Sequence, residues 1–332
     1  MMRLPRMDYI APTTVREACY LLAKDASKTK VLAGGTDLLV ACKLRNSKPT
    51  LLVSLGKIEE LKGIDLQENE LRIGAMTSLY EIRNHSVIIK QYPALAQASA
   101  SVGTLQLQYM GTLGGNLCLN TRCIYYNQSD SWRKSRAVCL KMGGETCHVI
   151  PKGKRCYAVY SGDTAPALMA LDARVKIISD KGERVIPLKD LYTNDGKEPI
   201  AVKPGEVLSE IRIPLPIDQQ GSRYLKYRQR GAIDFPLVGV AVRLNSNETG
   251  LCTDCKIVMT AISSGPREAF EAEELLKGKA LDPDLILKAS QKAMKEAHPV
   301  ANTSGDTEYR RKMSMILTHR ALNEVAKDIG LI

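Results

Sequence analysis

A cysteine-rich segment constrains the fold and the chemistry of this chain more than any other feature. Five of the nine cysteines lie between residues 118 and 156, in the spacing C-x4-C-x15-C-x7-C-x8-C. The segment has neither a helical nor a strand period, and such a long irregular stretch inside a compact domain is usually functional. Residues 1–11 lack the layout of a secretory signal, so we expect a cytoplasmic protein. Clustered thiols there favour a metal centre over a disulfide framework.

The spacing of these cysteines discriminates between kinds of metal centre. A zinc ribbon or finger has close cysteine pairs in both halves, whereas here only Cys118 and Cys123 are close. A plant-type 2Fe–2S site needs C-x4-C-x2-C, which is absent. The irregular separations fit a loop folded around a cuboidal cluster with four thiolates and one spare cysteine. Buried free cysteines are the alternative, and His148 beside Cys147 is a conceivable further ligand.

Positive charge is concentrated in the same segment. The chain has a net charge of +11, and residues 132–156 contain seven cations and one anion, Glu145. Such a run suits an anionic cofactor or an acidic protein partner. A basic zinc or nucleic-acid-binding module would need interleaved aromatics, and only Trp132 and the pair 125–126 are present, so we expect no nucleic acid. The seven cations are Arg133, Lys134, Arg136, Lys141, Lys152, Lys154 and Arg155.

The rest of the chain predicts two globular units of mixed helix and sheet. Its 332 residues are 44% hydrophobic and 25% charged, which is enough apolar material for two cores, and no apolar run is long enough to cross a membrane. A polar stretch at 217–223 reads as a linker. Beyond it, strands followed by helices predict an α+β unit. We expect helices at 13–23, 38–45, 78–85, 93–102, 165–171, 268–276, 284–297 and 307–326, and strands at 28–33, 51–55, 70–75, 175–178, 208–213, 224–230, 237–245 and 252–262.

Two glycine turns are candidate phosphate sites. The first, Gly34-Gly35-Thr36-Asp37, joins a strand to a helix, and its backbone N–H groups can converge on an anion. The second, Thr112-Leu113-Gly114-Gly115-Asn116, has the same chemistry. Neither matches a Rossmann fingerprint or a P-loop, and each could also be a simple turn. Two such turns suggest a ligand with two phosphates.

A third element, Ser161-Gly162-Asp163-Thr164-Ala165-Pro166, reads as a helix start with Asp163 as its N-cap. Together with residues 31–37 and 112–116, it resembles the FAD-binding motifs of the xanthine dehydrogenase and carbon monoxide dehydrogenase flavoprotein subunits. The resemblance covers essentially the whole chain. The cysteine segment is further similar to the β subunits of 4-hydroxybenzoyl-CoA reductases, which carry an additional 4Fe–4S cluster.

The resemblance implies a two-part α+β FAD-binding domain over residues 1–218, with a cluster-holding insert at 118–157. A C-terminal antiparallel sheet packed with helices would span 222–332. Cys118 would be the spare cysteine, and no catalytic residue is implied. Val102 stands where xanthine dehydrogenases have an aromatic residue, so NAD use is not expected. The cluster would be ligated by Cys123, Cys139, Cys147 and Cys156, and FAD would contact Val31, Leu32, Ala33, Gly34, Gly35, Thr36, Asp37, Val102, Thr112, Gly115, Asn116, Asp163, Val207 and Lys226.

The resemblance also implies the partners. They would be a molybdenum-cofactor (molybdopterin) subunit and a small subunit with two 2Fe–2S clusters, in a heterotrimer that can dimerise further. An acidic carrier such as ferredoxin would supply electrons through the 4Fe–4S cluster and FAD to the 2Fe–2S centres and molybdenum, where a phenolic hydroxyl is reductively removed. The alternative is the flavin subunit of an oxidative molybdenum hydroxylase that acts on a purine, an aldehyde or a heteroaromatic compound.

Overall fold

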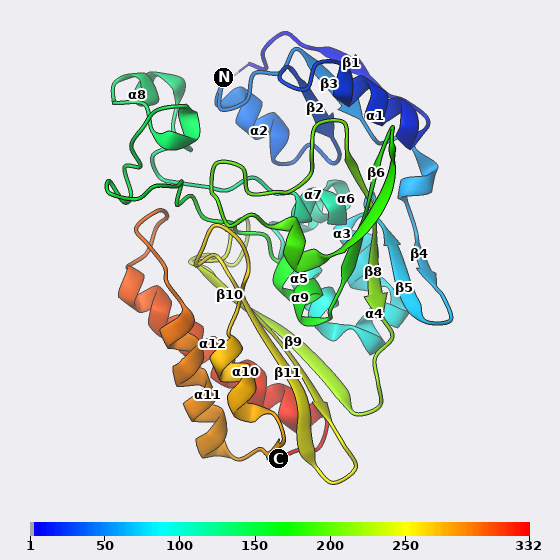
Figure 1. Ribbon diagram of the computed structural model, residues 1–332, viewed down its shortest axis with the longest axis vertical. Coiled ribbons are helices and arrows are strands. Elements are labelled where there is room, and N and C mark those ends of the chain that lie inside the picture. Colours follow the sequence, from blue (N-terminus) through cyan, green and yellow to red (C-terminus); the bar gives the residue numbers. More distant parts are fainter. Residues whose placement is uncertain (1–2) are drawn as a thin grey trace.

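A three-stranded parallel sheet opens the chain. The computed structural model describes residues 3–332 (Figure 1). Strand β3 (Leu51–Ser54) lies between β1 (Asp8–Ile10) and β2 (Thr29–Leu32). Helix α1 (Val15–Lys24) begins at Thr14, whose side chain accepts a hydrogen bond from the N–H of Glu17. Its apolar face packs on β3, and these residues form a separate small core.

A five-stranded antiparallel sheet forms the centre of the molecule, and its largest core lies between this sheet and the helices beside it. Strand β8 is its middle strand although it comes last in the sequence, so residues 64–214 close into one unit. Across the sheet the strands are β4 (Ile64–Leu66), β5 (Glu70–Gly74), β8 (Val207–Pro214), β6 (Arg174–Ser179) and β7 (Gly182–Pro187). The helices are α3 (Leu79–Asn84), α4 (Ser86–Gln91), α5 (Pro93–Ser101), α6 (Leu105–Met110), α7 (Leu113–Leu117) and α9 (Thr164–Ala170).

The C-terminal unit confirms the prediction of strands followed by helices. Helices α10 (Phe270–Leu276), α11 (Pro283–Glu296) and α12 (Thr307–Asp328) pack against an antiparallel sheet around a core of their own (Figure 1). The predicted linker is shorter than expected, because β9 already pairs with β10 from Gln220 onward. The strands are β9 (Gln220–Tyr227), β10 (Val238–Ser246), β11 (Leu251–Thr260), β12 (Arg267–Glu268) and β13 (Lys279–Ala280).

The cysteine segment is largely irregular, as predicted, and projects beside α2 (Leu38–Lys43) at the upper left of Figure 1. Its only helices are α8 (Asp130–Lys134) and a 3-10 turn over Leu140–Met142. The sequence analysis did not predict the short elements β1, β4, β7, α4, α6, α7 and α8. Strands β1 and β4 have three largely exposed residues each and therefore show no apolar alternation. None of the helices within residues 3–332 is long and apolar enough to span a bilayer.

Candidate functional site

The first glycine turn connects β2 to α2 at the carboxyl end of the parallel sheet. Gly35 has φ +73°, a conformation that favours glycine. Within residues 3–332, the backbone N–H groups of Gly34, Gly35, Thr36 and Asp37 donate to no other protein group. Successive free N–H groups in such a turn form a concave anion-binding surface. This turn therefore has the geometry expected for holding a phosphate.

The second turn lies directly against the first. A Cβ added to Gly34 would overlap the carbonyl oxygen of Met110, so only glycine permits this approach of the two backbones. A Cβ added to Gly115 would come 3.8 Å from the Cβ of Ala33 and 2.9 Å from Thr112 Oγ1. Apart from these contacts Gly115 is exposed. The two glycine turns thus face each other, as a ligand with two phosphates requires.

The two turns differ in the donors they offer, which the sequence did not predict. The second is helical from Leu113, and Thr112 caps it by accepting a hydrogen bond from the N–H of Gly115 at 3.1 Å. The N–H groups of Gly114 and Asn116 donate to the carbonyls of Ala75 and Thr112. Because the helix, its cap and the contact with Ala75 use these donors, only the first turn offers a set of free N–H groups.

Asn116 is oriented by the start of α9. Its Oδ1 accepts hydrogen bonds from the backbone N–H of Thr164 at 3.1 Å and from the Thr164 hydroxyl at 2.7 Å. Its Nδ2 makes no hydrogen bond within the described part of the chain, so this amide group is a free donor beside the second turn.

Asp163 precedes α9 as predicted, but its side chain does not cap the helix. The carboxylate is buried and instead accepts hydrogen bonds from the Tyr224 hydroxyl at 2.7 Å and from Lys226 Nζ at 3.0 Å. Lys226 also donates to the carbonyl of Ser101, next to Val102. Burial raises the pKa of Asp163 and lowers the pKa of Lys226, and their pairing opposes both shifts. Two predicted FAD contacts, Asp163 and Lys226, therefore bind each other, and both already have protein partners.

Two further predicted FAD contacts lie in different surroundings. Val31, on β2, is exposed close to the first turn. Val207 begins β8 and packs in the small core beneath α1, where its side chain is 3% exposed. The structure therefore does not bring the side chain of Val207 to the surface shared by the glycine turns. Strand pairing places Val207 opposite Ile178 of β6, and Ile178 packs against the same small core.

The four cysteines predicted as ligands line a single cavity. Tyr125, Tyr126, Leu140, Lys141 and His148 contribute to the same lining, whereas Cys118 does not. The remaining cysteines, Cys19, Cys42, Cys252 and Cys255, are buried elsewhere. Four cysteines from different parts of the segment thus line one cavity, and Cys118 lies outside its lining. That these four bind a metal stays a prediction.

No three His, Cys, Asp or Glu side chains among the described residues are grouped closely enough for one metal ion. Four cysteines line one cavity, and four thiolates are the number that a 2Fe–2S or a 4Fe–4S cluster requires.

Charge inside the cavity is set by burial. Burial raises the pKa of Cys123 and raises that of Cys156 to about 11, so these thiols are protonated at neutral pH unless a metal binds them. Burial also lowers the pKa of Lys141 to about 8. Burial in this cavity therefore disfavours the charged form of each of these groups.

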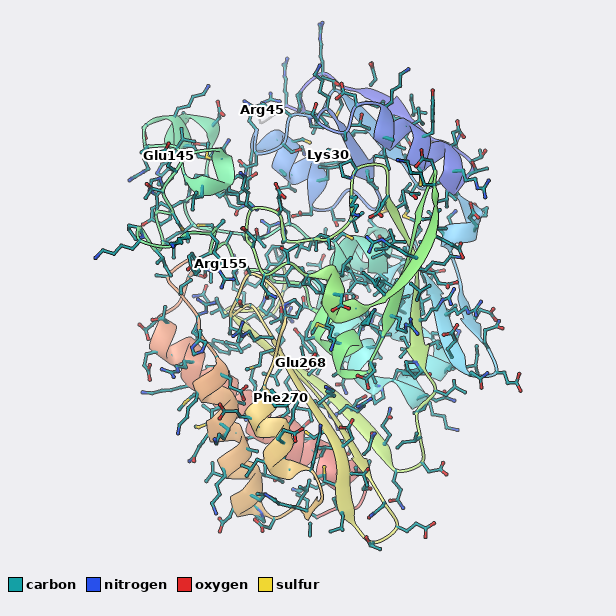
Figure 2. The ribbon with its side chains drawn as sticks, viewed as in Figure 1. Lys30, Arg45, Glu145, Arg155, Glu268 and Phe270 are labelled. Carbon is teal, nitrogen blue, oxygen red and sulfur yellow. The ribbon has the colours of Figure 1, made fainter. Side chains whose placement is uncertain are left out.

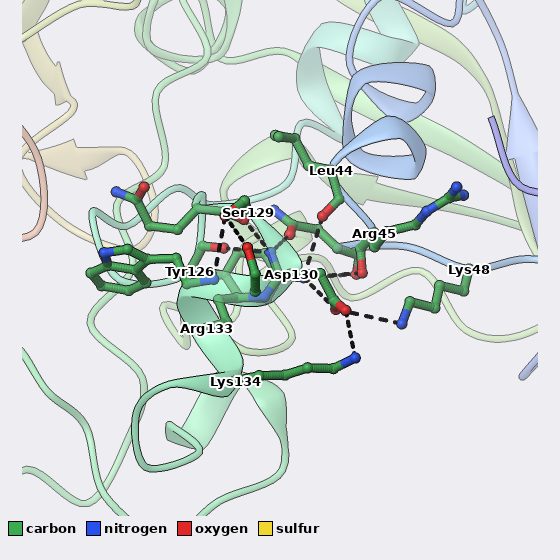
Figure 3. A network of polar contacts seen from close by, with 12 residues as sticks. Leu44, Arg45, Lys48, Tyr126, Ser129, Asp130, Arg133 and Lys134 are labelled. Carbon is green, nitrogen blue, oxygen red and sulfur yellow. Dashed lines mark hydrogen bonds and ion pairs between the residues drawn. The ribbon is translucent and has the colours of Figure 1, made fainter. Parts of the chain in front are cut away.

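Arg133 attaches the cysteine segment to the N-terminal unit (Figure 3). Its guanidinium is buried and donates to the carbonyls of Leu44 and Arg45, to Asn46 Oδ1 and to carbonyls of its own segment. Asp130, which pairs with Arg133, also contacts Lys48 and Lys134. Sequence reasoning counted Arg133 only as part of a basic run, and nothing in the local pattern distinguished it.

Burial also reduces the predicted basic surface. Arg133 is buried and Lys141 is half-buried, so five of the seven cations of residues 132–156 remain exposed. Figure 2 labels Arg155 and Glu145 on this segment, together with Lys30 and Arg45 of the neighbouring N-terminal unit. The exposed surface is still predominantly positive.

Comparison with known proteins agrees with this architecture. Residues 5–216 match the family of FAD binding domains in molybdopterin dehydrogenase, and residues 223–325 match the carbon monoxide dehydrogenase flavoprotein C-terminal domain. The carbon monoxide dehydrogenase medium chain of Afipia carboxidovorans is 29% identical, covering 95% of each chain. The xanthine dehydrogenase FAD-binding subunit of Escherichia coli O157:H7 is 25% identical, covering 97% of each.

A solved structure shows the same similarity in three dimensions. Carbon monoxide dehydrogenase from Hydrogenophaga pseudoflava aligns with a TM-score of 0.80 and 26% identity, over 97% of this chain and 98% of that chain. The chain therefore belongs to the FAD-binding medium subunits of the carbon monoxide dehydrogenase and xanthine dehydrogenase family of molybdenum hydroxylases, and it is an oxidoreductase subunit.

Proposed function

We propose that this chain is the electron-transfer subunit of a molybdenum hydroxylase complex, with FAD at the facing glycine turns and a 4Fe–4S cluster in the four-cysteine cavity. The observation that carries the cluster is the convergence of Cys123, Cys139, Cys147 and Cys156 on one cavity. Bound FAD exchanges electrons in pairs or singly, and a cluster exchanges them singly, so together they convert between the two modes.

The residues of this chain would hold the flavin as follows. The free N–H groups of residues 34–37 would receive the pyrophosphate, and Gly115 would leave room for it on the opposite side. Asn116 would donate through its free Nδ2. Asp163 could accept from a ligand hydroxyl only in addition to Tyr224 and Lys226, or by releasing one of them.

The direction of electron flow has two candidates. The relatives reported above are named as dehydrogenases. Their names favour the first candidate function, the flavin subunit of an oxidative hydroxylase. The four-cysteine cavity supports the second candidate, a subunit like the β chain of 4-hydroxybenzoyl-CoA reductase that serves a reductive dehydroxylation.

The names of the relatives also indicate which chains this subunit would bind. Relatives are named medium chains and complex subunits, so we propose a molybdenum-cofactor chain and a 2Fe–2S chain as partners. The five exposed cations of residues 132–156 would attract an acidic one-electron carrier such as ferredoxin. High salt should then slow the exchange of electrons with that carrier.

The test is a metal and flavin analysis of protein purified under argon. We expect about four iron atoms with matching sulfide, and one FAD, per chain. Zinc in place of iron, or full FAD with no iron, would overturn the cluster while leaving the flavin site intact. Co-purified partners would then be assayed with a low-potential reductant and with an oxidising acceptor, which distinguishes the reductive from the oxidative candidate.

A further inference from the structure

Lys141 is held in a fixed position beside the four-cysteine cavity. It lies in the 3-10 turn over Leu140–Met142, and its Nζ donates to Asn120 Oδ1 at 2.9 Å, to Thr121 Oγ1 at 2.7 Å and to the carbonyl of Gly196. An ammonium group has three hydrogens, so these three neutral acceptors use all of its donors. Its Nζ also lies 5.1 Å from the centre of the Tyr126 ring.

This ammonium group has no carboxylate partner. Among residues 3–332 Lys141 forms no ion pair, and Asp195 acts on it only from beyond ion-pair distance. By contrast, Lys134 in the same run pairs with Asp130. A half-buried cation without a counter-ion is costly, and such groups are usually paired. Lys141 lines the same cavity as the four cysteines, so a charged group held by them would lie near its ammonium.

We propose that Lys141 provides the counter-charge for the cluster and sets its reduction potential, an inference that rests on the proposed function. A cluster ligated by four thiolates is anionic, and adding an electron makes it more so. In a cavity of low dielectric constant, a fixed positive charge nearby stabilises the reduced form more than the oxidised form. Lys141 therefore raises the potential and makes the cluster easier to reduce.

The position of Lys141 distinguishes it from the surface cations of the same segment. Lys152 and Lys154 are exposed, where water and salt screen their charge. The ammonium of Lys141 is fixed by three hydrogen bonds and lines the cavity itself. Among the seven cations of residues 132–156, Lys141 should therefore have the largest effect on the reduction potential of the cluster.

The test compares Lys141→Met, Lys141→Arg and the surface control Lys152→Met in the full chain purified under argon. The readouts are iron content and the midpoint potential of the cluster from a redox titration followed by electron paramagnetic resonance. Lys141→Met should lower the ratio of reduced to oxidised cluster at a fixed potential about tenfold, which is ~59 mV for one electron. Lys141→Arg and Lys152→Met should each change the ratio less than threefold.

The outcomes separate this inference from the proposed function. Wild-type protein without iron would overturn the proposed cluster and the role of Lys141 with it. Equal midpoint potentials in wild type and Lys141→Met, with full iron in both, would overturn the role of Lys141 alone. If Lys141→Met does not retain iron, Lys141→Gln removes the charge while keeping a donor for Thr121, and its midpoint potential decides the question.

Discussion

The guanidinium of Arg122 contacts the carboxylate of Asp37, and this ion pair joins the cysteine segment to the first glycine turn. Arg122 immediately precedes Cys123, which lines the four-cysteine cavity, and Asp37 ends the run of free N–H groups. The pair neutralises a carboxylate that would otherwise stand beside the proposed phosphate site. It also means that the two proposed cofactor sites share a polar contact.

Removing this cation should weaken flavin binding. In Arg122→Met the carboxylate of Asp37 is left beside the phosphates, and we expect FAD affinity to fall about fivefold, or ~1 kcal/mol. Flavin fluorescence titration of the deflavinated protein measures this. The double variant Arg122→Met/Asp37→Asn should recover most of the affinity. If the second change restores nothing, the loss does not arise from the charge of Asp37.

The close approach of the two turns should be intolerant of a side chain. In Gly34→Ala the new Cβ overlaps the backbone carbonyl of Met110, which cannot rotate away. We expect a loss of about 1–3 kcal/mol in unfolding free energy and at least a tenfold loss of FAD affinity. Gly56→Ala is the control, because its Cβ would meet only Ser54 Oγ at 3.5 Å. Normal flavin content in Gly34→Ala would contradict the assignment of this turn.

The cavity predicts which cysteines matter for iron. Cys139→Ser should lose most of the iron and the visible absorption of the cluster while FAD stays bound, because the cavity and the glycine turns are separate sites. Cys118→Ser should keep its iron, because Cys118 does not line the cavity. Iron analysis alongside flavin analysis measures both. Equal iron loss in the two variants would refute the division into four ligands and one spare.

Arg133 should control how firmly the cysteine segment is attached. Arg133→Met leaves several carbonyl acceptors unpaired, at a cost of roughly 1–3 kcal/mol, and this cost falls on the contact between α8 and residues 44–46. We expect faster proteolytic cleavage within 118–157 and reduced iron, with FAD retained. Arg136→Met is the matched control, because Arg136 is exposed and lies over the Trp132 ring. Identical cleavage rates in the two variants would count against this role.

Glu273 should make the stability of the chain depend on pH. Burial raises its pKa to about 7, although Ile257 N–H donates to it and Lys256 lies nearby. The folded-state pKa exceeds the ordinary value of 4.5, so the folded protein binds a proton on Glu273 more tightly than the unfolded chain does. This proton contributes its full share to the free energy of unfolding below pH 4.5, and that share is lost as the pH rises through 7.

Glu273→Gln stays neutral and keeps an acceptor for Ile257. The variant should therefore be more stable than wild type above pH 7, on the order of 1–3 kcal/mol. Urea unfolding at pH 5 and pH 8 measures the difference. Glu274→Gln, at an exposed neighbour, should show no such change with pH. A wild-type protein with equal stability at both values would rule out this assignment.

The sequence by itself determined the turns, helices and strands whose conformation depends on residues close to one another in the chain. The Gly34-Gly35 turn between a strand and a helix, the helix from Pro93, and the strands-then-helices order after residue 220 were all predicted correctly. Cysteine spacing favoured a polynuclear centre over a zinc finger, a prediction that iron analysis now has to test. These features follow from backbone preference and side-chain period, which act over a few residues.

Only the tertiary structure decided which polar groups already have protein partners and which side chains are buried. It paired Asp163 with Tyr224 and Lys226 and placed Val207 in a core. It also gave the N–H donors of the second glycine turn partners in α7, in the Thr112 cap and in residues 75–77. It also buried Arg133 and set Lys141 beside the cysteines, although both belong to one basic run in the sequence. Hydrogen-bond partners and burial depend on contacts between segments distant in the chain, and residue type and spacing do not encode them locally.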